Sequence, residues 1–261
     1  MTSMDRIDAQ VIMAHVLGVN RAWIGANPMR ILTESEDAKI EALAVQREMG
    51  RPVAYLLERR EFYGYDFAVG PEVLIPRPET ETLVEAALVR LAPRDTCLDL
   101  GTGSGAIAVT IARQRPEGRV VATDASAAAI EVARRNAAAH ECADRIEFLH
   151  GSWYEPLGGR RFDAIVANPP YVAAGDPHLS KGDLRFEPRN ALTDGSADGL
   201  DSIRAIVSGA PGHLNPRGWL LLEHGYDQAG ATRGLLESAG FRDIVSIPDL
   251  AGIARVAGGK I

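Results

Sequence analysis

Four consecutive residues near the middle of the chain, Asn168, Pro169, Pro170 and Tyr171, combine side chains that can do chemistry; we call them the tetrad. The apolar run 164–167 before them predicts a strand, so they stand where that strand ends. The side-chain oxygen of Asn168 and the backbone carbonyl of Pro169 are two hydrogen-bond acceptors. The proline rings restrict φ and remove competing N–H donors, which holds the carbonyl outward. Tyr171 adds a flat ring that can stack on a planar group.

Two fixed acceptors suit the alkylation of a planar amide nitrogen or an aromatic amine. The lone pair of such a nitrogen is delocalised by the resonance that gives the peptide bond its barrier of roughly 18 to 20 kcal/mol, so the nitrogen is a poor nucleophile. Acceptors that hold its two N–H hydrogens would align it with a methyl group and stabilise the positive charge that develops during attack. We expect no dedicated general base, because the proton becomes acidic once the nitrogen is alkylated. The alternative is an Asn-Pro-Pro turn without a chemical role.

Upstream, the segment DLGTGSGAIAV at 99–109 predicts the end of a strand, a glycine-rich turn and the start of a helix. Its glycines, Gly101, Gly103 and Gly105, would let the backbone turn sharply and let a ligand approach the main chain. The spacing also satisfies the loose dinucleotide pattern, so an enzyme that uses nicotinamide or flavin is an open alternative. Asp99 favours S-adenosylmethionine, because its carboxylate would repel a pyrophosphate but attract the cationic amino and sulfonium groups of that methyl donor.

Two later residues complete a predicted nucleotide site. Asp124 ends the apolar run 120–123, where a carboxylate can accept hydrogen bonds from both hydroxyls of a ribose, unless it only caps the helix predicted from Ser126. Trp153 follows the run 146–149 and offers a flat apolar wall for an adenine, with Ser152 as a polar contact. The alternative for Trp153 is an ordinary core tryptophan.

The elements that must hold these residues alternate between strands and helices from Pro78 onward. Strands are predicted at 97–100, 120–123, 146–149, 164–167, 219–223 and near Ile244 and Val256. Helices are predicted from Pro78 to about Leu91, after Gly105, and at 126–140, about 200–210 and 227–239. Continuous apolar strands that alternate with helices indicate a largely parallel, doubly wound α/β sheet, which binds ligands at the carboxyl ends of its strands.

Ahead of that sheet, residues 1–60 predict a small bundle of about three helices, with Thr33 and Glu36 as a capping box for one of them. At 61–77, aromatic and β-branched residues alternate around glycines, which predicts a β-hairpin linker. The main domain is then expected at 78–261.

The composition is that of a globular protein, with 261 residues, 46% of them hydrophobic, and a formal net charge of −7. No apolar stretch approaches the roughly 18 to 20 residues of a membrane span. The N-terminus shows no export signal, so we expect a cytoplasmic protein. Cys97 and Cys142 are expected to be packing residues, and the scattered histidines predict no metal site. The acidic balance disfavours a nucleic-acid substrate.

Several stretches resemble the release factor glutamine methyltransferase family, which comprises HemK or PrmC-like enzymes. The matching stretches are RPVAYLLERREFYGYDF, VLIPRPETE, DLGTGSGAIA, NPPY, FEPRNAL and DGLDSIR. The resemblance implies a seven-stranded, Rossmann-like class I methyltransferase domain and an N-terminal helical docking domain joined to it by a β-hairpin. It also implies that S-adenosylmethionine methylates the glutamine in the Gly-Gly-Gln motif of peptide chain release factors, which gives N5-methylglutamine and S-adenosylhomocysteine.

The resemblance also implies roles for individual residues. The donor would contact Gly101, Thr102, Gly103, Ser104, Gly105, Asp124, Trp153 and Asn168. The substrate glutamine would contact Asn168, Pro169, Pro170 and Tyr171, with Asn168, Pro169 and Tyr171 as catalytic residues. Release factors are the implied partners, and we expect a monomer without stable binding to nucleic acid or membranes.

Four charged residues have roles that the sequence leaves open. Glu79 and Glu81 belong to VLIPRPETE, a stretch similar to the release factor branch of the family rather than to the ribosomal protein uL3 branch. They either act in catalysis or favour a helix N-terminus. Glu187 and Arg189 either order a flap over the substrate or form a simple surface ion pair.

Two alternatives stay open beside glutamine methylation. An N6-adenine or N2-guanine nucleic-acid methyltransferase meets the same chemical problem, because its target is an exocyclic amine. A noncatalytic binding module on the same fold is the other, although the tetrad and the glycine-rich turn together argue against it. The chain also departs from the family in a short N-terminus and in Ile253 and Ala254, where an arginine and an acid are common. Its docking surface is therefore expected to follow the family less closely than its reacting groups.

Overall fold

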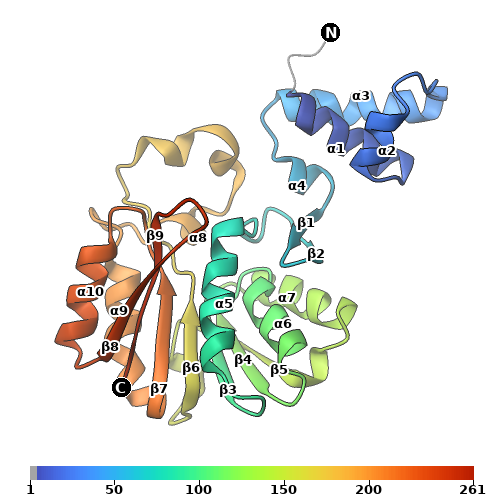
Figure 1. Cartoon of the computed structure of the whole chain (residues 1–261). Coiled ribbons are helices and arrows are strands. Elements are labelled where there is room, and N and C mark those ends of the chain that lie inside the picture. The colour runs from blue at the N-terminus through green and yellow to red at the C-terminus, as the bar shows by residue number, and fades with distance from the viewer. Residues whose placement is uncertain (1–4) are drawn as a thin grey trace.

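The computed structural model describes residues 5–261, which form a helical N-terminal part, a two-stranded hairpin and a seven-stranded α/β domain (Figure 1). The first four residues, which belong to the expected helical domain and to the segment considered for an export signal, lie outside the described residues. Within residues 5–261, every helix is too short or too polar to cross a membrane.

The N-terminal part consists of four helices, one more than the sequence suggested. They are α1 (Arg6–Leu17), α2 (Arg21–Ala26), α3 (Glu34–Glu48) and α4 (Val53–Leu56). The predicted capping box begins α3: the backbone N–H of Thr33 donates to Glu36, and the backbone N–H of Glu36 donates to Thr33 Oγ1. Gly50 follows the same helix with a φ of 90°, a left-handed value that favours glycine.

The hairpin consists of β1 (Arg59–Phe62) and β2 (Tyr65–Ala68), which pair antiparallel. It begins ahead of the predicted linker at 61–77 and ends well before Arg77, so the expected boundary after residue 60 falls inside β1. The polar residues at the start of β1 resemble a helix surface in sequence, and only their pairing with β2 makes them a strand. The following residues form no strand and instead bury Val69, Val73 and Ile75 in a small core.

The α/β domain contains the predicted seven-stranded, mostly parallel sheet. Its strands are β3 (Thr96–Leu100), β4 (Arg119–Asp124), β5 (Ile146–His150), β6 (Phe162–Ala167), β7 (Leu214–Glu223), β8 (Arg242–Pro248) and β9 (Ala254–Lys260). They lie in the order β5-β4-β3-β6-β7-β9-β8, and β9 runs antiparallel to both of its neighbours. The chain moves outward from β3 through β4 to β5 and returns on the other side of β3 with β6, so the sheet has its topological switch point between β3 and β6.

Helices cover both faces of the sheet (Figure 1). One face packs against α5 (Glu81–Arg90), α6 (Ala106–Gln114) and α7 (Ala127–Ala139), and the other against α9 (Asp201–His213) and α10 (Ala229–Ser238). Successive strand residues alternate between the two cores, as the two-residue period of a strand requires: Cys97 packs with α5 and α6, whereas Leu98 packs with α9. Both free cysteines, Cys97 and Cys142, are buried as predicted.

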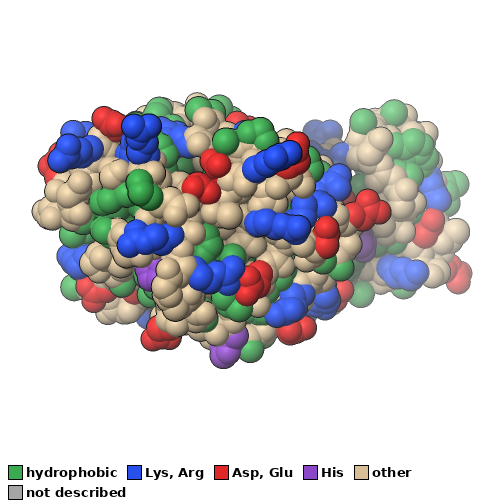
Figure 2. Space-filling view, turned by 90° about the horizontal axis from the view of Figure 1, so that it is seen from below, with side chains coloured by type: hydrophobic (Ala, Val, Ile, Leu, Met, Phe, Trp, Pro, Cys, Tyr) green, Lys and Arg blue, Asp and Glu red, His purple; other side chains and the backbone are tan. Residues whose placement is uncertain are grey.

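The remaining short elements lie in the connections. They are α8 (Arg189–Leu192) and the 3-10 turns η1 (Pro78–Thr80), η2 (Ala143–Arg145), η3 (Glu155–Leu157), η4 (Pro177–Ser180) and η5 (Gly182–Phe186). The turns η4 and η5 belong to the long connection between β6 and α8, which rises above the carboxyl edge of the sheet (Figure 1). The opposite end of the molecule, seen in Figure 2, carries Lys and Arg side chains mixed with Asp and Glu.

Gly105 tests how the glycine-rich turn is packed. Its φ is 81°, and a Cβ at this position would lie 3.0 Å from the Cβ of Ala133 and 3.1 Å from its Cα on α7. We expect Gly105→Ala to lower the free energy of unfolding by about 1 to 3 kcal/mol, because both the backbone and the helix contact become strained. Thermal and urea unfolding measure this change.

Gly234→Ala is the matched control, because Gly234 lies inside α10 with nothing within 4 Å of the added Cβ. There, alanine should be neutral or stabilising by up to about 1 kcal/mol. Equal stabilities of the two variants would contradict the packing role of Gly105.

Candidate active site

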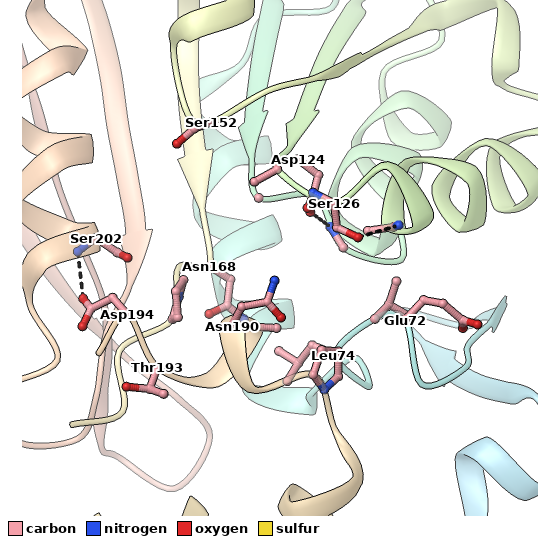
Figure 3. A pocket seen from close by; sticks show the side chains of 18 of the residues that line it. Glu72, Leu74, Asp124, Ser126, Ser152, Asn168, Asn190, Thr193, Asp194 and Ser202 are labelled. Atoms are coloured by element: carbon pink, nitrogen blue, oxygen red, sulfur yellow. Dashed lines mark hydrogen bonds between the residues drawn. The ribbon is translucent and has the colours of Figure 1, made fainter. Parts of the chain in front are cut away.

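A cavity of about 330 Å³ opens at the carboxyl edge of the sheet, and we call it the larger cavity (Figure 3). Its volume lies in the range of small-molecule sites, which is roughly 300 to 1,000 Å³. The predicted site residues in its wall are Gly101, Gly103, Asp124, Ser152, Trp153, Asn168 and Pro170. They come from the ends of four neighbouring strands, so the structure brings together residues that the sequence holds far apart.

The glycine-rich turn presents its backbone to the larger cavity at two positions. The N–H groups of Gly101 and Thr102 both donate to the carbonyl of Thr123, at 2.9 and 3.0 Å, which ties the turn to β4. Gly101 and Gly103 have φ values of 72° and 54°. Open space lies where a Cβ of Gly103 would stand, so a ligand can approach the main chain there.

The other three residues of this turn are not part of the wall of the larger cavity, and their contact with the donor stays a prediction. Thr102 and Ser104 are buried, and the Thr102 hydroxyl donates to Asp99 Oδ2 at 2.6 Å. The carbonyl of Ser104 accepts from the side chain of Asn136 at 2.8 Å. Gly105 packs against α7. These three residues fix the conformation of the turn through contacts with Asp99, Asn136 and α7.

Asp99 is fully buried and is not part of the wall of the larger cavity. Its Oδ2 is held by Thr102, and its Oδ1 has no hydrogen-bond partner among residues 5–261. Burial raises the pKa of Asp99 to about 7. The carboxyl lies beneath the turn, and its expected contact with the cationic groups of the donor stays a prediction.

Asp124 faces the larger cavity with both carboxylate oxygens already oriented (Figure 3). Oδ2 accepts from the backbone N–H of Gly103 at 2.9 Å, and Oδ1 accepts from that of Ser126 at 2.8 Å. The cap of α7 itself is Ser126, whose hydroxyl accepts from Ala129. Burial raises the pKa of Asp124. Each oxygen keeps a lone pair, so the carboxylate can accept from two neighbouring hydroxyls of a ribose.

Trp153 forms a wall of the larger cavity while its edge packs against the turn. Its ring lies 3.3 Å from the position of a Cβ at Gly101, a tight contact that, with the left-handed φ of 72°, favours glycine there. The backbone of Trp153 has a φ of 44°, and its carbonyl accepts from Thr123 Oγ1 at 3.1 Å. A flat apolar surface beside a carboxylate suits an adenosine group.

The tetrad divides between two cavities. Asn168 and Pro170 line the larger cavity, whereas Pro169 and Tyr171 line a neighbouring cavity of about 170 Å³, which we call the smaller cavity. Successive residues of an extended chain point to opposite sides, which explains this division. Asn168 also lines the smaller cavity, so it stands where the two meet.

The two predicted acceptors of the tetrad are available. Among the described residues, neither Asn168 Oδ1 nor the Pro169 carbonyl accepts a hydrogen bond. Asn168 Nδ2 instead donates to Thr80 Oγ1 at 3.0 Å, and the Tyr171 hydroxyl donates to Glu223 Oε1 at 3.0 Å. Burial, and then the Glu223 carboxylate, raise the pKa of Tyr171, which keeps this hydroxyl protonated.

Several residues in the wall of the larger cavity had no role assigned from the sequence. Glu72, Thr193 and Asp194 lie outside the stretches that resemble the family. The others lie within VLIPRPETE, FEPRNAL or DGLDSIR; they are Val73, Leu74, Pro188, Asn190, Ala191 and Ser202. Asp194 turns away to accept from the backbone N–H of Ser202 at 2.8 Å (Figure 3). Thr80 and Glu223 lie behind the tetrad. The sequence did offer one sign of Glu223: its carboxylate ends the apolar run LLLE, a predicted strand whose carboxyl end lies at the same sheet edge as the tetrad.

Glu187 and Glu81, whose roles the sequence left open, hold parts of the chain together. Glu187 is buried; it forms an ion pair with Arg77 and accepts from the backbone N–H of Ile75 at 3.0 Å. Arg189 is exposed and does not pair with Glu187 within the described structure. Of the two alternatives for these residues, the surface ion pair is therefore not formed. Glu81 accepts from the backbone N–H of Tyr63 at 2.9 Å, which joins α5 to the hairpin.

Two family models match the chain. The model described as Methyltransferase small domain matches residues 79–182, and the model described as PrmC N-terminal domain matches residues 2–57. The release factor glutamine methyltransferase of Xylella fastidiosa (strain Temecula1) is 50% identical over 259 residues, which cover 98% of this chain and 94% of that protein. That of Bordetella pertussis is 51% identical and covers 99% of this chain and 96% of its own length.

Solved structures resemble the fold at lower sequence identity. A methyltransferase from Pyrococcus furiosus has a TM-score of 0.58 at 19% identity and covers 84% of this chain and 96% of its own. The 16S rRNA N2 G1207 methyltransferase of T. thermophilus, solved with AdoMet and guanosine, has a TM-score of 0.56 at 24% identity. The match covers 77% of this chain and 49% of that one. At these identities the likeness supports the fold alone.

Asp124→Asn tests the larger cavity as the site for S-adenosylmethionine. In an asparagine, an NH₂ group would replace one of the two oxygens and would face the N–H of Gly103 or Ser126, so one of these hydrogen bonds would be lost. The side chain would also lose the charge that strengthens hydrogen bonds to hydroxyls. Such bonds contribute about 1.5 to 3 kcal/mol, so we expect the Kd for S-adenosylmethionine to rise about 10- to 100-fold in isothermal titration calorimetry. Asp144→Asn, at an exposed site on η2, should leave the Kd unchanged. An unchanged Kd for Asp124→Asn would exclude this carboxylate from the donor site.

Proposed function

Because this chain belongs to the release factor glutamine methyltransferase family, we propose that it transfers a methyl group from S-adenosylmethionine to N5 of a glutamine in peptide chain release factors. The glutamine is that of the Gly-Gly-Gln motif. The observation that carries the chemistry is the pair of unoccupied acceptors on neighbouring residues: Asn168 Oδ1, on the residue that lines both cavities, and the carbonyl of Pro169, which lines the smaller one.

The larger cavity would hold the methyl donor. Asp124 has the geometry to accept from the ribose hydroxyls, and Trp153 offers the surface for the adenine. Gly101 and Gly103 leave the main chain open to the methionine part of the donor. S-Adenosylmethionine, when bound there, would supply an electrophilic methyl group for transfer. A carboxylate, an aromatic surface and exposed main chain are therefore all present in the wall of the larger cavity, and each suits one part of this donor.

The smaller cavity would receive the glutamine side chain. Its wall has apolar surfaces from Leu74, Pro169 and Tyr171, which suit the methylene groups and the planar amide. Asn168 Oδ1 and the Pro169 carbonyl would accept the two N–H hydrogens and direct the nitrogen toward the larger cavity. As the nitrogen attacks, the same oxygens would stabilise its growing positive charge. The methylated nitrogen then loses its proton without a dedicated base.

The N-terminal helices, expected as a docking domain at 1–60, would contact the body of the release factor. They are joined to the main domain by more than the hairpin, because Arg47 on α3 pairs with both Asp8 on α1 and Asp183 in η5. Release factors act in the cytoplasm, so we expect the enzyme to work there, as a monomer. Methylation of an exocyclic base amine, the predicted alternative, is not favoured, since the relatives that span nearly the whole chain carry the glutamine name.

A methyl-transfer assay tests the proposed function. The purified protein is incubated with labelled S-adenosylmethionine and, separately, with a release factor, its Gly-Gly-Gln→Gly-Gly-Ala variant, and RNA. We expect label on the intact release factor, at N5 of the glutamine by mass spectrometry, and none on the other two. Label confined to RNA would refute the assignment.

Asn168→Ala tests the chemistry of the tetrad. Removal of one of the two acceptors should lower kcat by about 100-fold or more, because the nitrogen loses both its alignment and its charge stabilisation. The Kd for S-adenosylmethionine, measured by calorimetry, should change by less than about fivefold, since most of the wall of the larger cavity remains. A variant with near-normal kcat would show that the amide oxygen of Asn168 does not take part.

A further inference from the structure

The Asn168 side chain can serve the reaction in only one of its two orientations. An amide group carries an oxygen acceptor on one side and an NH₂ donor on the other, with nearly the same shape. A half-turn of the side chain would present NH₂ to the NH₂ of the substrate, and two donors repel. Some part of the protein must therefore distinguish the two orientations.

A buried chain of hydrogen bonds behind Asn168 makes this distinction. Asn168 Nδ2 donates to Thr80 Oγ1 at 3.0 Å, and the Thr80 hydroxyl donates to Glu223 Oε2 at 2.7 Å. The other oxygen of Glu223 accepts from the Tyr171 hydroxyl at 3.0 Å. Thr80 is 4% exposed and Glu223 is 1% exposed, so water does not compete for these bonds.

The direction of the chain follows from the number of protons. The carboxylate of Glu223 can only accept, and Thr80 has a single hydroxyl hydrogen. Once Thr80 donates that hydrogen to Glu223, its oxygen can only accept from Asn168. The NH₂ group of Asn168 is therefore directed to Thr80, and its oxygen is directed to the cavities. A flipped Asn168 would place two oxygens opposite each other without a hydrogen between them, which is costly in a buried site.

The fold brings the three residues together from distant parts of the chain. Ala167 pairs with Leu222 in the parallel register of β6 and β7, so the next residues, Asn168 and Glu223, lie side by side at the end of these strands. Thr80 stands at the end of η1, directly before α5, and α5 packs on both β6 and β7. Positions of this kind are set by tertiary packing.

We propose that Thr80 and Glu223 are positioning residues that hold the Asn168 amide with its oxygen toward the substrate glutamine. The inference rests on the proposed function and deepens it, because it names what prepares the tetrad for methyl transfer. Neither residue lines the larger or the smaller cavity: both act through Asn168, and Glu223 also holds Tyr171.

The charge of Glu223 links this arrangement to pH. Burial raises the pKa of Glu223 to about 7; the hydrogen bonds from Thr80 and Tyr171 and the charge of Arg255 oppose this rise, and Glu79 adds to it. A protonated Glu223 has its own hydrogen to donate, and the direction of the chain is no longer imposed. Activity that depends on the carboxylate is present above the pKa and is lost as the pH falls through about 7.

The first experiment compares Thr80→Val with Thr80→Ser. Valine keeps the shape of threonine but removes the hydroxyl, so we expect kcat on a release factor to fall about 10- to 100-fold, with a Kd for S-adenosylmethionine within about threefold of the wild type. Serine keeps the hydroxyl and should restore kcat to within about threefold. Thr82→Val is the matched control, because Thr82 is close in sequence and makes no side-chain hydrogen bond in the described structure.

The second experiment measures the pH profile of kcat for the wild type and Glu223→Gln. A glutamine can donate to Thr80 and free the threonine hydrogen to hold Asn168 in the flipped orientation. We expect a low kcat at every pH and no fall on the acid side near pH 7, whereas the wild type shows that fall. Glu237→Gln, at an exposed ion pair on α10, should keep the wild-type profile.

The outcomes separate this inference from the proposed function. Absence of any label on release factor with the wild-type protein refutes the proposed function. Normal wild-type activity together with wild-type kcat in Thr80→Val, or with an unaltered acid limb in Glu223→Gln, refutes the positioning role alone. Equal loss in the valine and serine variants of Thr80 also refutes it, because loss of the hydroxyl would then not be the cause.

Discussion

The parallel pairing of β6 with both β3 and β7 is the constraint on which the whole site depends. Leu100 pairs with Ala167, and Ala167 pairs with Leu222, so three strands end at the same level. The glycine-rich turn, the tetrad and Glu223 consequently lie at the same edge of the sheet. Slippage by one residue would move each strand's buried side chains to the opposite face, so the two cores on either side of the sheet enforce the register. The packing of ordinary apolar residues thus determines where the polar ones meet.

Three carboxyl groups lie in or behind that edge, although burying a carboxylate opposes folding. Burial raises the pKa of both Asp99 and Glu223 to about 7 and also raises that of Asp124. Each one holds a neighbouring donor in place: Asp99 holds Thr102, Asp124 holds the backbone of Gly103, and Glu223 holds Thr80. A cationic ligand in the larger cavity would favour their ionised forms, so the free energy spent on burial is partly recovered when the donor binds.

Local pattern was enough to predict the parts of the site that sit directly on strand ends. Asp124, Trp153 and Asn168 each follow an apolar run, and the structure places all three around the larger cavity. Thr80 could not be found this way, because in sequence it is one of several polar residues at a helix start, and only the packing of α5 brings it to Asn168. The division of the tetrad between two cavities also could not be predicted from the sequence. It depends on the path of the loop that contains Leu74 and on the segment 188–194, which form the other walls of the cavities.

The long connection between β6 and α8 joins the reacting groups to the N-terminal helices. Glu187 near its end is paired with Arg77, which lines the smaller cavity, and Asp183 in η5 is paired with Arg47 on α3. The Arg185 guanidinium also donates to the carbonyl of Met49 at 2.9 Å. Breaking the pair of the buried Glu187 would leave a charge without a partner, which is costly, whereas the more exposed contacts of Asp183 and Arg185 are weaker. If the N-terminal helices shift, we therefore expect η5 to move with them. The ion pair of Glu187 with Arg77 would keep that movement from reaching the smaller cavity, where the glutamine is to be bound.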